Sequence, residues 1–96
     1  MKINRIKDKG KEYISVFVDK STSSGLLRFG HEISVTFLKE KDKLIFDSAW
    51  HCGVSEMSWD SSEENLFEEM FPGLLEEMRS EIVKVQYIKL WRVRIN

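Results

Sequence analysis

Side chains alternate in character along two segments in the first half of the chain, 13–18 and 32–38. Residues 2–7 are a more weakly patterned candidate, and residues 44–50 are expected to return as the partner of 32–38. Because successive side chains of a strand point to opposite faces of a sheet, this alternation predicts β-strands. The turn signal Asp8-Lys9-Gly10-Lys11 and the charged run 39–43 predict hairpins between neighbouring strands. The predicted strands are residues 2–7, 13–18, 32–38 and 44–50.

The clearest strand also predicts the core side of the sheet. In the segment 32–38, Ile33, Val35 and Phe37 share one face, while the alternate residues are polar. In the segment 13–18 both faces are partly apolar, which favours a strand inside the sheet. One face of this segment carries Ile14, Val16 and Val18, and the other carries Tyr13, Ser15 and Phe17.

Two segments of the chain lack a regular pattern. Residues 19–30 form one long loop that carries Leu26, Leu27 and Phe29, which either cap the core or offer a contact surface. Residues 51–60 are too irregular to predict as strand or helix.

A helix is predicted to follow, with Ser61 as its N-cap and Glu64 completing a capping box. Pro72 interrupts the helical pattern, and the adjacent Gly73 favours two helices over one kinked helix. Glutamates occupy the opposite side of this amphipathic segment. The apolar stripe that we expect to face the core is Leu66, Phe67, Met70, Phe71, Leu74, Leu75, Met78 and Ile82.

The last segment, 83–95, is rich in β-branched and aromatic residues of one parity, which predicts a final strand. The expected order is therefore β-β-β-β-α-β. The fold class is α+β: an antiparallel sheet of about five strands, with a Pro-interrupted acidic amphipathic helix packed on one face.

Length and composition indicate one globular domain, residues 1–96, with 42% apolar residues and a single proline. Cys52 is the only cysteine, so no internal disulfide can form, which favours a reducing compartment. The N-terminus lacks the apolar stretch of a signal peptide, and no window reaches the length of a membrane helix. We therefore expect a soluble cytoplasmic protein that does not enter a membrane.

Charge is sorted strongly along the chain, although the formal net charge is only −1. Residues 56–81 contain nine acidic side chains and one cation, Arg79, and so carry −8. Residues 1–55 carry +3, and residues 82–96 carry +4. Such polarity bears on partners and on association rates, not on the fold.

Catalytic and metal-binding signatures are weak. His51 and Cys52 are neighbours, and adjacent side chains of an extended segment point apart, which suits a thiol–imidazole pair poorly. No spacing of His31, His51 and Cys52 matches a metal site, and the glycines are scattered, so no phosphate-binding loop is formed. We expect no enzyme activity, no cofactor and no metal.

The segment 50–60 and the acidic helix predict a protein-binding surface. Trp50 is expected in the core, whereas Trp59 is expected to be exposed or half-exposed, with Met57 as a second apolar anchor. Beside this anchor, carboxylates would complement a basic partner. The expected partner-binding residues are Glu56, Met57, Trp59, Asp60, Glu63, Glu64, Glu68, Glu69, Glu76 and Glu77.

In size and charge layout the chain resembles bacterial immunity proteins and antitoxins, although no stretch is a family signature. The resemblance implies a small inhibitor that neutralises a basic, nucleic-acid-cleaving toxin by occlusion. Two alternatives stay open: a nucleic-acid-binding domain that uses the basic, aromatic segment 87–94, and another interaction or oligomerisation module. The oligomeric state is not predicted.

Overall fold

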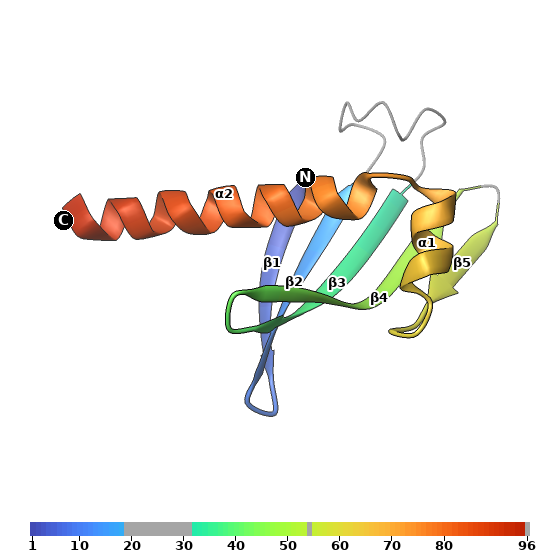
Figure 1. The fold of residues 1–96 in the computed structure, drawn as a ribbon, viewed down its shortest axis with the longest axis horizontal. Helices are drawn as coiled ribbons and strands as arrows, with labels where there is room; N and C mark the ends of the chain where they lie inside the picture. The colour runs from blue at the N-terminus through green and yellow to red at the C-terminus, as the bar shows by residue number, and fades with distance from the viewer. Residues whose placement is uncertain (19–31, 54, 96) are drawn as a thin grey trace.

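The protein is an α+β domain in which five antiparallel strands precede two helices (Figure 1). The computed structural model describes residues 1–18, 32–53 and 55–95, and for residues 86–95 it describes the backbone alone. The predicted loop 19–30, with its three apolar residues, lies outside the described residues. The elements are β1 (Lys2–Asp8), β2 (Lys11–Val18), β3 (Glu32–Glu40), β4 (Lys43–Cys52), β5 (Glu56–Trp59), α1 (Glu64–Met70) and α2 (Leu74–Ile95).

Each strand of the sheet pairs with the next strand along the chain, in the order β1-β2-β3-β4-β5. The four predicted strands are present, with the hairpins that join β1 to β2 and β3 to β4, and burial alternates along β2 and β3. Lys9 and Gly10 take positive φ in the first hairpin, and Lys41 does so in the second. A bulge between Thr36 and Phe37 shifts the register of β3 against β4.

The fifth strand is not the one that the sequence predicted. β5 pairs with β4 inside the segment that we expected to be irregular, and a backbone hydrogen bond from Gly53 N–H to Ser55 O closes the turn between them. The segment Glu56–Trp59 is too short to show a pattern. It becomes a strand because it pairs with the edge of β4.

The predicted strand 83–95 is wrong, because α2 continues without interruption to Ile95. β-propensity reflects fit to a pleated surface and is overridden by context. Here the β-branched residues are interleaved with good helix formers such as Lys84, Lys89 and Leu90, and the helix is already propagating from Leu74. The observed order is β-β-β-β-β-α-α.

The core lies between one face of the sheet and the two helices. The predicted inward face of β3 is fully buried together with Ile14, Val16 and Val18 of β2, and Met78 and Ile82 of α2 join it. The other end of the core is aromatic: Phe67 of α1 lies 5.8 Å from Phe46 and 5.1 Å from Phe71, between ring centroids. α1 ends at Met70 and α2 begins at Leu74, with Pro72 and Gly73 (φ +82°) between them.

Candidate partner-binding surface

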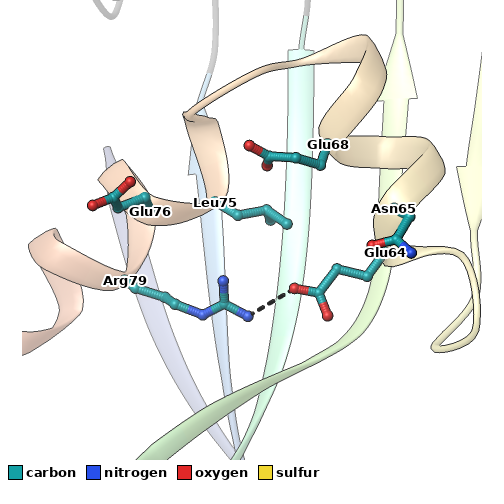
Figure 2. A pocket seen from close by; sticks show the side chains of 6 residues that line it. All are labelled: Glu64, Asn65, Glu68, Leu75, Glu76 and Arg79. Carbon is teal, nitrogen blue, oxygen red and sulfur yellow. Dashed lines mark hydrogen bonds and ion pairs between the residues drawn. The ribbon is translucent and has the colours of Figure 1, made fainter.

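The acidic segment folds into a helix pair with a cleft of about 350 Å³ between α1 and the first turns of α2 (Figure 2). α1 contributes two carboxylates to the cleft, and α2 contributes one. Leu75 is buried at its base. The cleft is lined by Glu64, Asn65, Glu68, Leu75, Glu76 and Arg79.

Arg79, the cation of this segment, makes three contacts within the molecule. Its Nη2 lies 3.1 Å from Oε2 of Glu64, and its Nε donates to the carbonyl oxygen of Leu44 at 3.1 Å. Its guanidinium carbon also lies 5.1 Å from the ring centroid of Phe37. Arg79 therefore ties α2 to the sheet and to α1, and it neutralises one glutamate, Glu64.

Several of the other predicted carboxylates take part in local hydrogen bonds. Glu68 Oε1 accepts from the backbone N–H of Gly73 at 3.0 Å, which fixes the turn between the helices. Glu56 Oε1 accepts from Trp50 Nε1 at 2.6 Å. Glu63, which is half-buried, accepts from the backbone N–H of Asp60 at 3.0 Å.

Three predicted carboxylates remain on the surface without such an engagement. Glu69, Glu76 and Glu77 are exposed, and no hydrogen bond or ion pair joins their side chains to another residue in the described ranges. With Glu68, whose side chain is also exposed, they form the acidic helix surface, defined as Glu68, Glu69, Glu76 and Glu77.

The predicted exposure of Trp59 is wrong, because this side chain is only 6% exposed. Its ring packs edge-on against Phe67 at 5.1 Å and 87°, and against Phe71 at 6.2 Å and 81°. Trp50 was expected in the core, and this prediction is also wrong, because Trp50 is half-buried and lies outside the core cluster. A bulge at Asp47 of β4 puts Phe46, Ala49 and His51 on the helix side and Trp50 on the opposite side of the sheet. Trp59 pairs with Ala49 and therefore also faces the helices.

The apolar side chains that are exposed beside the acidic helix surface are different ones. Met57 on β5 is 37% exposed, as the sequence predicted for an anchor. Leu66 and Met70, one turn apart on α1, are 53% and 48% exposed, which contradicts their expected place in the core stripe. Since α1 is only seven residues long, it turns Phe67 alone toward the core. The sequence analysis drew one apolar stripe across both helices, and that stripe put Leu66 and Met70 inside.

The predicted capping box at Ser61 and Glu64 is wrong as well. α1 starts at Glu64 with Glu63 as its N-cap residue, and no side chain caps it. The reciprocal bonds form one residue earlier, where Asp60 accepts from Ser62 and Glu63 reaches back to Asp60. Aspartate accepts two bonds from a turn more readily than serine, which moves the turn toward the N-terminus.

Asp60 is the side chain of this turn whose titration is displaced. The Ser62 hydroxyl donates to Asp60 Oδ1 at 2.6 Å and the Ser62 backbone N–H donates at 2.9 Å, and together they hold the pKa of Asp60 below its ordinary value. A carboxyl whose pKa is lower in the folded state stabilises the fold above its ordinary pKa. That contribution is lost as the pH falls through the lowered pKa.

Replacing Ser62 with alanine is expected to raise the pKa of Asp60 part of the way toward its ordinary value, because the hydroxyl bond is lost and the backbone bond is kept. A carboxyl ¹³C NMR titration measures this shift. Ser61→Ala is the matched control and should leave the Asp60 titration unchanged. Equal curves for the two serine variants would contradict the assigned hydrogen bond.

The two neighbours considered for chemistry, His51 and Cys52, lie at the end of β4. His51 is 4% exposed between the rings of Phe71 and Trp59, at centroid distances of 5.1 and 6.5 Å. Cys52 is half-buried and pairs with Glu56 in the ladder. Its side chain points to the opposite side of the sheet from that of His51. Among the described residues, no three His, Cys, Asp or Glu side chains are grouped as a metal site would require.

No helix in the described part of the chain is long and apolar enough to span a membrane. Comparisons with protein-family models, with curated proteins and with solved structures found no match for this chain. The surface geometry and its charge are therefore the basis for a functional proposal.

Proposed function

We propose that this protein is a small protein-binding inhibitor of the bacterial immunity or antitoxin type. It neutralises a basic, nucleic-acid-cleaving toxin in the cytoplasm by covering the surface that the toxin uses to bind phosphate. The observation that carries the proposal is the acidic helix surface, whose four exposed glutamates have no ion-pair partner among the described residues. The nearby guanidinium of Arg79 is committed to Glu64 and to the sheet.

The mechanism is steric and electrostatic occlusion without catalysis. Carboxylates on two adjoining helices present the kind of charge that a nuclease cleft binds in its substrate. Such complementarity raises association rates toward about 10⁸–10⁹ M⁻¹s⁻¹ at low salt. Glu69 and Glu77 supply this steering charge with the smallest structural role, since they lie outside the cleft of Figure 2.

The apolar anchor of the proposed interface differs from the one that the sequence suggested. Met57, Leu66 and Met70 are exposed on β5 and α1, and α1 lies beside β5 in the fold (Figure 1). Exposed methionine and leucine can fill a partner's pocket, and flexible methionine adapts to its shape. Trp59 supports this surface from beneath, through its contact with Phe67.

Charge reversal on the acidic helix surface tests the proposal. The partner is recovered from source-cell lysate on the immobilised protein and identified, and its binding is measured by stopped flow. The Glu69→Lys/Glu77→Lys variant is expected to lower the association rate by about 10- to 100-fold at low salt and to flatten its salt dependence. The wild-type protein should also block cleavage of RNA or DNA by the partner at an equimolar ratio.

The matched control is Glu40→Lys/Asp42→Lys. It makes the same change in net charge on exposed residues at the β3–β4 hairpin, which lies away from α1 (Figure 1). This control should retain most of the wild-type rate. Equal losses in the two variants would reduce the effect to net charge, and a partner without nucleic-acid-cleaving activity would contradict the proposed class.

A further inference from the structure

The side of α2 that faces away from the sheet has a pattern of its own. Leu74, Met78 and Ile82 bury the inner side of the helix in the core. On the outer side Val83 is 57% exposed, more than any other large apolar side chain in the described ranges. Figure 1 shows that α2 then runs well past the edge strand β1 to its C-terminus. The outer side of this long helix therefore offers a surface that the sheet does not use.

Six positions of α2 form one stripe along this outer side, with spacings that alternate between four and three residues. Such alternation is the seam of a two-helix coiled coil. The first three positions are exposed, and because the backbone is helical to Ile95, the last three continue the same stripe. We call this stripe the α2 seam; it consists of Glu76, Ser80, Val83, Tyr87, Leu90 and Arg94.

The α2 seam is acidic at one end, apolar in the middle and basic at the other end. Over the whole helix, residues 74–81 contain three glutamates and Arg79, whereas residues 82–95 contain four cations and no acid. An anionic membrane or a nucleic acid would be attracted by the second half and repelled by the first. An antiparallel copy of the same helix complements both halves, so the charge pattern selects this occupant.

We propose that the α2 seam binds the α2 seam of a second copy of this chain in antiparallel orientation, about a two-fold axis that crosses the helices at residue 85. Since the core side of each α2 points away from the seam, the two sheets lie on the outer sides of the dimer. Each contact occurs twice, as in the commonest homodimers. The levels that this axis brings together are Glu76 with Arg94, Ser80 with Leu90 and Val83 with Tyr87.

The charges beside the seam agree with this pairing. The axis brings Glu81 to the level of Lys89, and it brings no two like charges to one level. Lys84 comes within two residues of the level of its own copy, but its Nζ lies 3.5 Å from Oε1 of Glu81 in the same helix, which offsets the repulsion. Arg92 comes within one residue of the level of Arg79, whose guanidinium already forms an ion pair with α1.

The geometry predicts a weak dimer. The core already holds the first turns of α2 as a helix, so pairing requires little ordering there. The seam is short, however: residues 76–94 span about 27 Å at about 1.5 Å per residue. We therefore expect a dimer Kd between about 1 µM and about 1 mM. The dimer covers Glu76, so a second copy and the proposed toxin compete for this part of the acidic helix surface.

Sedimentation velocity on the protein alone tests the dimer over this concentration range, in which the wild-type protein is expected to shift from monomer to dimer. Val83→Lys and Leu90→Lys place charge in the apolar middle of the seam, and each is expected to raise the dimer Kd at least about tenfold. Ile45→Lys, at a side chain of β4 that is 40% exposed, is the control and should leave the dimer unchanged. Circular dichroism checks that each variant is folded.

A charge exchange tests the antiparallel orientation. Glu76→Arg and Arg94→Glu are each expected to raise the dimer Kd about three- to tenfold, and the double variant should return it to near the wild-type value. A parallel pair cannot give this rescue, because it places each residue beside its own copy. Glu40→Arg, on the exposed β3–β4 hairpin, makes the same change in net charge as Glu76→Arg and should leave the Kd unchanged.

Three results overturn the proposal, and none of them depends on the proposed toxin. The first is a wild-type protein that stays monomeric; binding of phosphatidylserine vesicles or of a DNA duplex would then assign the helix to a polyanion instead. The second is a dimer that is lost in Ile45→Lys and kept in Val83→Lys. The third is a double variant at residues 76 and 94 that stays as weak as the single variants.

Discussion

Replacing Trp59 with alanine is expected to lower the free energy of unfolding by about 3–5 kcal/mol. The indole is 6% exposed and contacts Phe67 and Phe71 in edge-on geometry, so truncation opens a cavity in the aromatic end of the core. Urea denaturation followed by far-UV circular dichroism measures the loss. For a domain of this size the loss is a large share of the total stability, about 5–15 kcal/mol.

Met57→Ala is the control for Trp59, because both residues lie on the same side of β5 and Met57 is 37% exposed. Its effect on unfolding should stay within about 0.5–1 kcal/mol, as for a surface site. In the partner assay the order should reverse: Met57→Ala weakens binding directly. If Trp59→Ala left unfolding unchanged and weakened only binding, the tryptophan would be the exposed anchor that the sequence suggested.

The second large effect is expected from Ile82→Ala, at about 2–5 kcal/mol of lost stability. Ile82 is 1% exposed in the core, whereas its neighbour Val83 is 57% exposed on the outer side of α2. Val83→Ala should change the free energy of unfolding by less than about 0.5 kcal/mol, since alanine is also the better helix former. Denaturation curves of the two variants give the comparison.

This pair also discriminates the observed helix from the strand that the sequence predicted. In the predicted strand, Val83 shared the parity of Val85 and of Trp91, and would have pointed inward. A strand would therefore give the larger loss at Val83. A larger loss at Val83 than at Ile82 would contradict the helix at this position.

The sheet was largely predictable, because alternation over six or more residues is a strong signal. The buried set of Ile33, Val35 and Phe37 followed directly from it. In residues 13–18 both faces are partly apolar, so the pattern did not decide that Ile14, Val16 and Val18 are the buried side chains. The short strand β5 was not predictable, since four residues carry little pattern and the strand depends on the free edge of β4. That omission explains the wrong placement of Trp59, whereas the bulge in the β3–β4 ladder explains the wrong placement of Trp50.

The helices show where local preference was a poor guide. Val83, Val85 and Val93 favour strands individually, but they follow a helix that is already formed. The predicted stripe treated α1 and α2 as one surface and therefore placed Leu66 and Met70 in the core. Both are exposed, because the break after Met70 changes which residues of α1 face the core. The periodicity of apolar residues does not show how the axis of one helix is oriented relative to the other after the break at Pro72.

The sequence predicted that the candidate surface is acidic, but it did not predict which of its carboxylates are free of intramolecular contacts. The surplus of carboxylates in residues 56–81 is a property of composition. Only the structure shows which of these carboxylates are engaged within the molecule. Arg79 forms an ion pair with Glu64, and the backbone N–H of Gly73 donates to Glu68. Glu69, Glu76 and Glu77 are exposed and remain available to a partner, and their spacing in the sequence does not predict this.

The sequential order of the strands bears on how the chain reaches this structure. Every ladder of the sheet joins neighbours along the chain, so no pairing of strands requires a later segment. Low contact order of this kind favours rapid folding. The sheet can therefore assemble from its first hairpin onward during synthesis, and the two helices, which emerge last, seal its apolar side.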